Sequence, residues 1–282
     1  MCCDLMRDRN VKLVKAFYNA IAEDYDKEYE TTYMRLYNEI TWSNLKRYLP
    51  KKKNAVVLDA GGGTGYWAIR LAQYGYDVVL TDISEIMLKA AQRKIEQENL
   101  QQNIETRLVD IRDMSCFPSE YFDLVMAQGD PVSYCLDPEK ALSELSRTVK
   151  MNGHVLISVD NKYAMIPRFI REKAFDELTE FLRTGILTQE EMPGSLVGSF
   201  RFQAFTPEEL RSLFTTCGLQ VVRIIGKPIL THLVPRARAR YLMEGSDGDD
   251  HSTQDEKPRS VSALSVLQPR WVAGWNASCL IF

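Results

Sequence analysis

Short apolar runs alternate with amphipathic segments through the middle of the chain, and several of the runs end in an aspartate. The apolar runs predict strands over residues 56–59, 78–82, 104–109, 122–127, 155–159 and 219–225. Helical spacing predicts helices over 66–75, after Ser84, after Asp137-Pro138 and after Thr206-Pro207. Strands that are apolar on both faces and alternate with helices are typical of a parallel sheet covered on both sides. The pattern therefore predicts a Rossmann-like, doubly wound α/β fold.

The segments around this alternating region suggest additional parts. Residues 1–50 are predicted to form a helical cap, because 8–24 has an amphipathic helical pattern and a second helical stretch follows. The main domain is expected over 51–243, with an inserted lid at 161–204 that contains a helix over 169–182. Residues 244–282 are predicted to be disordered or weakly ordered, because they begin with an acidic, serine-rich stretch.

Charge and cysteine content narrow the function classes. The 282 residues carry a formal net charge of −3, which gives no support to a broad nucleic-acid surface, so we expect no nucleic-acid partner. Six cysteines without a C-x-x-C pair argue against a zinc site or a disulfide framework, and we expect no metal and a cytoplasmic location. No apolar run reaches the roughly 18 residues that a membrane span needs. Oligomeric state has no signature in the sequence.

A glycine-rich turn follows the first predicted strand, in the segment Asp59-Ala60-Gly61-Gly62-Gly63-Thr64-Gly65. Glycines between a strand and a helix allow a ligand to approach bare backbone. Gly63-x-Gly65-x-x-Ala68 also fits the dinucleotide fingerprint, so the glycines alone leave two cofactor classes open. Asp59 favours a cofactor with a positively charged amine over a dinucleotide, because a carboxylate repels a pyrophosphate and attracts a cation.

Two further aspartates end the second and third predicted strands. Asp82 lies about 20 residues after the turn, where a ribose diol is bound in such folds. Asp110 could accept a hydrogen bond from an adenine amino group. The carboxyl ends of parallel strands share one edge of the sheet, so these groups together suit a ligand with a cation, a ribose and an adenine but no phosphate.

The glycine segment resembles motif I of class I S-adenosylmethionine-dependent methyltransferases, and Asp82 and Asp110-Ile111 stand where that family contacts ribose and adenine. Residues 17–26 are similar to the leader of the ubiquinone/menaquinone-biosynthesis-like, small-molecule branch, which implies that Tyr25 lies near the donor. The resemblance also implies S-adenosylmethionine as cofactor and a mostly parallel seven-stranded sheet with one antiparallel strand near its edge.

Other residues near the predicted strand ends complete the candidate site. Ile83 and Met87 are candidates for an apolar cofactor wall, with core packing as the alternative interpretation. Gln128 and Gly129 are expected to contact the amino-acid end of the donor. Asp130 or Tyr134 could orient or deprotonate an acceptor, although Asp130 could equally begin a turn before Pro131.

The sequence thus predicts an S-adenosylmethionine-dependent methyltransferase that transfers a methyl group to a small molecule by in-line displacement. The absence of an N/D-P-P-Y/F/W motif after the fourth strand argues against base N-methylation. Two alternatives remain: a non-catalytic protein that binds the donor, and an NAD(P)-dependent oxidoreductase.

Overall fold

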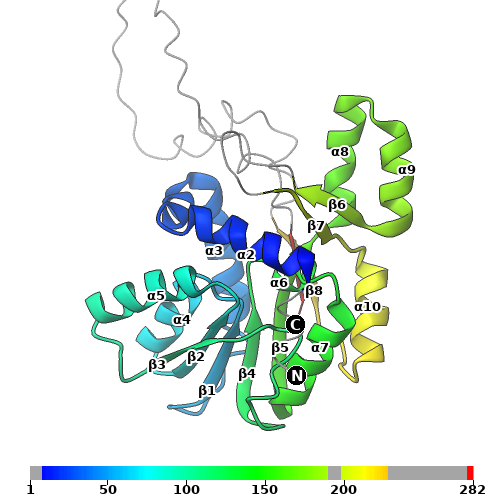
Figure 1. The fold of residues 1–282 in the computed structure, drawn as a ribbon. Helices are drawn as coiled ribbons and strands as arrows, with labels where there is room; N and C mark the ends of the chain where they lie inside the picture. The colour runs from blue at the N-terminus through cyan, green and yellow to red at the C-terminus, as the bar shows by residue number, and fades with distance from the viewer. Residues whose placement is uncertain (1–7, 190–197, 228–277, 282) are drawn as a thin grey trace, which may run out of the picture.

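The computed structural model describes residues 8–189, 198–227 and 278–281. At its centre, five parallel strands lie in the order β3-β2-β1-β4-β5 (Figure 1). Their bounds are Val56–Ala60 (β1), Asp77–Asp82 (β2), Ile104–Leu108 (β3), Phe122–Ala127 (β4) and Val149–Asp160 (β5). The five strands confirm the predicted α/β class and the positions of the first four strands closely.

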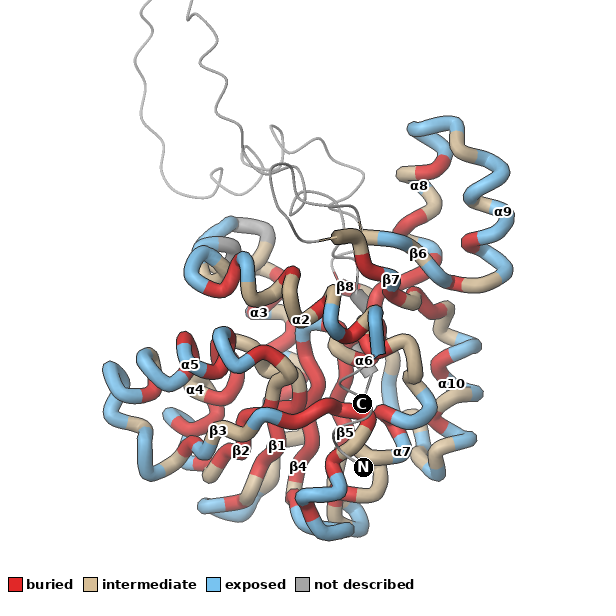
Figure 2. The backbone as a smooth tube through the Cα atoms, in the orientation of Figure 1, coloured by how far each residue is buried: buried red, intermediate tan, exposed pale blue. Residues whose placement is uncertain are grey.

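Helices cover both faces of this sheet, as the two-sided apolar strands predicted. On one face, Val57, Val78 and Leu124 pack with α3 (Thr32–Leu45), α4 (Tyr66–Gln73) and α5 (Glu85–Gln97). On the other face, Leu58, Val79 and Val125 pack with α7 (Pro138–Thr148) and α10 (Pro207–Thr216). Burial is accordingly concentrated along the central strands β1, β2 and β4, which are mostly red in Figure 2. The doubly wound arrangement brings all the strand ends that carry aspartates to one edge.

Local sequence signals set the helix starts accurately. The Ser84 side chain accepts from the Met87 N–H and begins α5, and Asp137 accepts from Lys140 and begins α7. Thr206 and Glu209 form a reciprocal capping box at the start of α10. Each cap satisfies backbone donors that the first helical turn leaves unpaired, which is why these starts could be read from the sequence.

The N-terminal segment forms α2 (Arg9–Ile21), a 3₁₀ turn η1 (Tyr25–Glu30) and α3. The apolar face of α2 is buried through Val11, Val14, Phe17 and Ile21. Figure 1 shows α2 crossing the carboxyl edge of the sheet. This element therefore lies over the place where the strand ends meet.

The inserted segment differs from the prediction of one helix over 169–182. It forms two helices, α8 (Lys162–Glu172) and α9 (Phe175–Thr184), because Lys173 adopts φ 57° and ends α8. A two-stranded antiparallel sheet follows, made of β6 (Ile186–Gln189) and β7 (Phe200–Gln203). Phe200 and Phe202, which share one face of β7, are both buried against α2 and α6 (Pro131–Tyr134).

Two strand predictions also require correction. β5 begins at Val149 rather than at 155, because the chain passes directly from α7 into the strand and accommodates Asn152 at φ 62° within an irregular stretch of the β4–β5 pairing. The predicted strand over 219–225 is shorter and later, as β8 (Ile224–Lys227). The preceding residues 219–223, which follow the turn at Gly218 that ends α10, make no strand pairing.

The last described segment is β9 (Ser278–Ile281), which pairs antiparallel with both β5 and β8. Its pairing is made by the backbone, and side-chain alternation gave no sign of it. The remainder of 244–282 lies outside the described residues. Among the described helices, none combines the length and the apolar character that crossing a membrane requires.

Candidate functional site

A pocket lies at the carboxyl edge of the sheet, beneath α2. Of the residues predicted from the sequence, it is lined by Tyr25, Gly61, Gly63, Asp82, Ile83, Met87, Asp110, Ile111, Gln128, Gly129 and Tyr134. Three predicted residues do not line it: Asp59, Gly65 and Asp130. The strand ends and the glycine turn therefore do converge, as expected for ligands of parallel α/β sheets.

The glycines of the turn have different physical roles. Gly63 has φ 55°, and a Cβ there would meet no atom within 4 Å, so its bare backbone faces open pocket. Gly65 has φ 80°, and a Cβ there would lie 3.2 Å from Leu80 and 3.3 Å from Ala91. Gly65 thus allows α4 and α5 to pack closely on β2, which explains why it does not line the pocket.

Asp59 is fully buried just below the turn. A Cβ on Gly62 would lie 2.5 Å from the Asp59 Oδ2 atom, so the absence of a side chain at 62 makes room for the carboxylate. Neither oxygen accepts a hydrogen bond of normal geometry, although the nearby Ala68 N–H has a lowering effect on the pKa. Burial, and then the charge of Asp82, raises the pKa of Asp59 to about 7.

Asp82 both lines the pocket and supports the surrounding backbone. Its Oδ2 atom accepts from the Gly63 N–H at 3.0 Å, and its Oδ1 atom accepts from the Ser84 N–H at 2.7 Å. Burial raises its pKa to about 6 despite these two donors. Carboxylate oxygens have two acceptor directions each, so both can still accept from a ligand hydroxyl.

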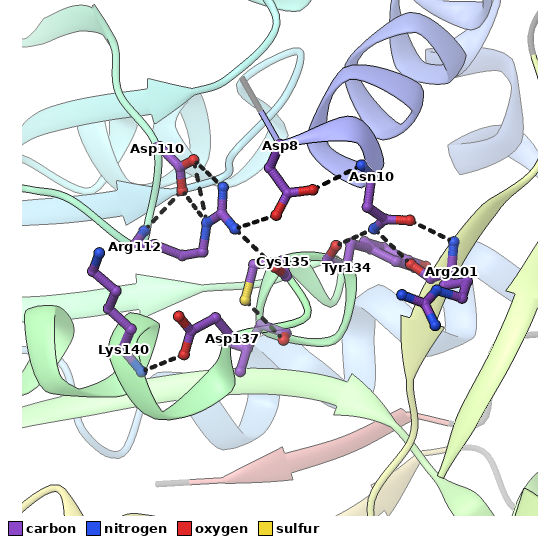
Figure 3. A network of polar contacts seen from close by, with 10 residues as sticks. Asp8, Asn10, Asp110, Arg112, Tyr134, Cys135, Asp137, Lys140 and Arg201 are labelled. Atoms are coloured by element: carbon purple, nitrogen blue, oxygen red, sulfur yellow. Dashed lines mark hydrogen bonds and ion pairs between the residues drawn. The ribbon is translucent and has the colours of Figure 1, made fainter. Parts of the chain in front are cut away.

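Asp110 is engaged in a buried ion pair that the sequence did not predict. Arg112 donates from Nη2 to Asp110 Oδ2 at 2.8 Å, and also contacts Asp8 Oδ2 at 3.2 Å (Figure 3). The same close-up shows Asn10 of α2 beside Arg201 of β7. The Arg201 N–H donates to Asn10 Oδ1 at 2.8 Å, and Asn10 Nδ2 donates to the Arg201 carbonyl at 2.9 Å. Asp110 therefore links α2 to the pocket wall, in addition to lining the pocket.

Four tyrosines form an aromatic wall, of which Tyr18 and Tyr29 were not predicted. The ring centroid of Tyr18 lies 6.1 Å from that of Tyr25 and 6.0 Å from that of Tyr134. The ring of Tyr29 lies 5.7 Å from that of Tyr25. Tyr18 belongs to α2, and because this helix lies over the strand ends it presents part of its apolar face to the pocket.

Asp160, at the end of β5, is a further buried acid that the sequence reasoning left without a role. Its N–H donates to Ser133 Oγ at 2.9 Å, while its Oδ2 atom has no hydrogen-bond partner. Burial and the charge of Asp130 raise the pKa of Asp160 well above its usual range. The only sequence signal for it was that the fifth predicted strand, like the first three, ends in an aspartate.

Among the described residues, an unpartnered acceptor oxygen lies on Gln128, which lines the pocket, and others lie on Asp59 and Asp160, which are buried behind the lining. Buried acceptors without donors are destabilising, and they are best satisfied by a cation or by N–H and O–H groups. No Lys, Arg or His is among the described residues that line the pocket. The arrangement fits a cationic ligand bearing amino and hydroxyl groups, and it does not fit a diphosphate.

The known proteins that this chain resembles are methyltransferases. The family model described as a methyltransferase domain matches residues 57–153. Phosphatidylethanolamine N-methyltransferase of Cereibacter sphaeroides is 32% identical over 165 residues, which are 52% of this chain and 79% of that protein. The tRNA 5-carboxymethoxyuridine methyltransferase of Escherichia coli is 28% identical over 166 residues, covering 57% of this chain and 60% of the relative's length.

A solved S-adenosylmethionine-dependent methyltransferase from Methanosarcina mazei shares the fold, with a TM-score of 0.56, 21% identity, and coverage of 65% of this chain and 87% of that one. The chain therefore belongs to the class I S-adenosylmethionine-dependent methyltransferases, a family of enzymes whose cofactor is S-adenosylmethionine. The family resemblance seen in the sequence is confirmed.

Proposed function

We propose that this protein transfers a methyl group from S-adenosylmethionine, bound in the pocket beneath α2, to a small-molecule acceptor. The observation that carries the proposal is the set of buried acceptor oxygens without partners beside a glycine turn, with no basic side chain among the described lining residues. A cationic nucleoside would supply a donor to the Gln128 oxygen that lines the pocket, and its positive charge would offset the buried carboxylates behind the lining.

Each proposed donor contact follows from the position of the residue in the pocket. Asp82 would accept from the ribose hydroxyls, and the open backbone at Gly63 would lie against the donor. Ile83, Met87 and Ile111 would form the apolar wall beside the adenine, while Asp110 contributes to that wall through its pair with Arg112. Asp59 would act through its charge from below the turn, because it does not reach the pocket surface.

The opposite end of the pocket would position the reacting groups. Gln128 is held by its Nε2 donation to the Leu156 carbonyl at 3.1 Å, which leaves its Oε1 atom for the donor's ammonium group, next to Gly129 and Tyr25. Tyr134 would lie at the acceptor side, and its N–H donates to the Asp130 carbonyl at 3.3 Å. The bound donor supplies an electrophilic methyl group, so the protein's main contribution is alignment, which can provide up to about 7–11 kcal/mol of the barrier.

The architecture supports acceptor selection by the peripheral elements. In this proposal the sheet is seven-stranded, with β9 as its antiparallel member between β5 and β8. The segment 1–50 serves as the cap, and 161–204 as the lid that contacts it through Asn10 and Arg201. These elements meet over the pocket at Tyr134, whose ring lies 5.8 Å from that of Phe200.

A nucleic-acid acceptor is a second candidate, because one relative methylates a tRNA nucleoside. The net charge of −3 and the acidic pocket favour a small molecule instead, since nucleic-acid binding depends on basic contacts to phosphates. Incubation with labelled donor and either total tRNA or a metabolite extract distinguishes the two. We expect S-adenosylhomocysteine to form with the extract and not with tRNA.

Donor class is tested by thermal stabilisation with S-adenosylmethionine, S-adenosylhomocysteine, NAD⁺ and NADP⁺. The first two should raise the melting temperature of the wild type and of Gly218→Val, but not of Gly63→Val. Gly218 is a matched control, because it also has positive φ and open space but lies in the turn after α10. Stabilisation by NAD⁺ alone would instead support the oxidoreductase, and donor binding without turnover would support the non-catalytic alternative.

A further inference from the structure

Asp26 lies in η1, the 3₁₀ turn whose Tyr25 and Tyr29 line the pocket, although Asp26 itself is not among the lining residues. Its Oδ1 atom accepts from the Thr64 hydroxyl at 2.6 Å, and its Oδ2 atom accepts from Lys94 Nζ at 2.7 Å. Thr64 belongs to the glycine turn, and Lys94 belongs to α5. One carboxylate therefore joins η1 both to the glycine turn and to the helix that follows β2.

The two partners of Asp26 differ in their exposure to water. Thr64 is buried, with 1% of its surface exposed. The side chains of Asp26 and Lys94 are 43% and 28% exposed. A half-exposed ion pair is weakened by the surrounding water, whereas a buried hydroxyl that donates to a carboxylate makes a strong hydrogen bond and is costly to leave unpaired. The contact with Thr64 is therefore the stronger of the two links.

An aromatic contact supports the same attachment of η1. The ring of Tyr29 stacks on that of Tyr66, with centroids 4.5 Å apart and an interplanar angle of 13°. Tyr66 is the first residue of α4 and directly follows the glycine turn. Tyr29 lines the pocket and also a second groove, which Asp26, Tyr66 and Lys94 line as well. Tyr29 is therefore part of the wall between the pocket and this groove.

We propose that Asp26 is a positioning residue of the donor site, which fastens η1 to the glycine turn through the Thr64 hydroxyl and so holds the pocket-lining tyrosines of η1 in place. This inference rests on the proposed function. A turn that is already fixed in its binding geometry loses less conformational entropy when a ligand binds, and this increases affinity. Because Asp26 and Thr64 act through one shared hydrogen bond, the effects of removing either end should not add.

The inference is tested by calorimetric measurement of S-adenosylhomocysteine affinity in variants at the two ends of this hydrogen bond. Asp26→Ala and Thr64→Val each remove one end, their double variant completes a mutant cycle, and Thr64→Ser retains the hydroxyl. The matched control is Asp24→Ala, which removes a nearby acid whose pair with Lys27 is exposed. The melting temperature of each ligand-free variant reports the stability of the fold separately.

Asp26→Ala and Thr64→Val should each weaken S-adenosylhomocysteine binding by about tenfold or more, as expected for a hydrogen bond to a charged group. The double variant should bind no more weakly than the single variants, and Thr64→Ser and Asp24→Ala should keep the affinity of the wild type.

Three results would overturn the inference while leaving the proposed function intact: lower melting temperatures with unchanged affinity, losses that add in the double variant, or equal losses in Thr64→Ser and Thr64→Val. Failure of S-adenosylhomocysteine to bind the wild type would overturn the proposed function, and the inference with it.

Discussion

At the scale of single residues, Asp59 is a buried carboxylate that opposes stability at neutral pH. A carboxylate that is buried without hydrogen-bond partners favours its protonated form, and the pKa of Asp59 is raised to about 7. The unfolded chain releases that proton at about pH 4. Between these values the folded state holds more protons than the unfolded state, so the contribution of Asp59 to stability falls as pH rises.

The first prediction follows from this difference. At about pH 8, Asp59→Asn should have a free energy of unfolding larger than the wild type by up to about 4 kcal/mol, and the difference should shrink towards about pH 4. Urea unfolding at the two pH values measures it, with the exposed Asp176→Asn as control. The same Asp59→Asn variant should lose donor affinity. A difference that does not change with pH would show that the Asp59 carboxylate is not the destabilising group.

Asp82 gives a second prediction, because it combines two roles that the sequence presented as alternatives. Its oxygens accept from Gly63 and Ser84 and also line the pocket. Asp82→Ala should weaken S-adenosylhomocysteine binding by about 1–3 kcal/mol, the range for one or two lost hydrogen bonds. Calorimetry measures this loss.

The control for Asp82 is Thr206→Ala, which removes a helix cap far along the chain in α10. It should lower stability by about 1 kcal/mol and leave affinity unchanged. If Asp82→Ala behaves like Thr206→Ala, Asp82 has only the capping role.

At the scale of elements, α2 is tied to the rest of the molecule by a few polar contacts above the pocket. Asp8 contacts Arg112, Asn10 contacts Arg201, and Asn19 accepts from the Ser84 hydroxyl at 2.6 Å. Val11, Val14 and Tyr18 of the same helix line the pocket. The attachment of α2 and the binding of a ligand should therefore depend on each other.

The third prediction tests that dependence. Asp8→Asn removes the charge that pairs with Arg112, so backbone amides of α2 should exchange hydrogen faster while those of β1 and β4 stay protected. Adding S-adenosylhomocysteine should slow the exchange again. The control Asp24→Asn breaks an exposed pair with Lys27 and should change little. Unchanged exchange in α2 would show that the Asp8–Arg112 contact does not hold the helix.

The same scale shows which elements the sequence could predict. Caps such as Ser84 and Thr206 and the glycine turn act through their own neighbours, so their structures follow from local chemistry. The break at Lys173 depends on a positive φ at a non-glycine residue. The strand β9 depends on backbone pairing with β5 and β8. Neither feature leaves a side-chain pattern in the sequence. Asp110 was predicted to lie at the pocket. Its ion pair with Arg112 was not predicted, because it depends on the turn after Asp110 that directs the arginine side chain back to the carboxylate.

At the scale of the whole molecule, the sheet gathers acids from distant parts of the sequence onto one edge, and α2 covers that edge. Asp59, Asp82, Asp130 and Asp160 each follow or end a different strand. The charge of Asp82 raises the pKa of Asp59, and the charge of Asp130 raises that of Asp160, so a bound cation would stabilise the ionised carboxylates. The fold therefore builds a negative pocket although the chain as a whole carries a net charge of only −3. We expect a cationic nucleoside to bind at this edge.

Isothermal titration calorimetry of the wild type with S-adenosylmethionine, in two buffers of different ionisation enthalpy near pH 7, tests it most directly. We predict saturable binding at one site, with a heat that depends on the buffer, because the bound cation lowers the raised pKa of Asp59 and releases protons. Gly63→Val should show no binding heat. Absence of saturable binding by the wild type, or saturable binding of NAD⁺ in its place, would contradict the account.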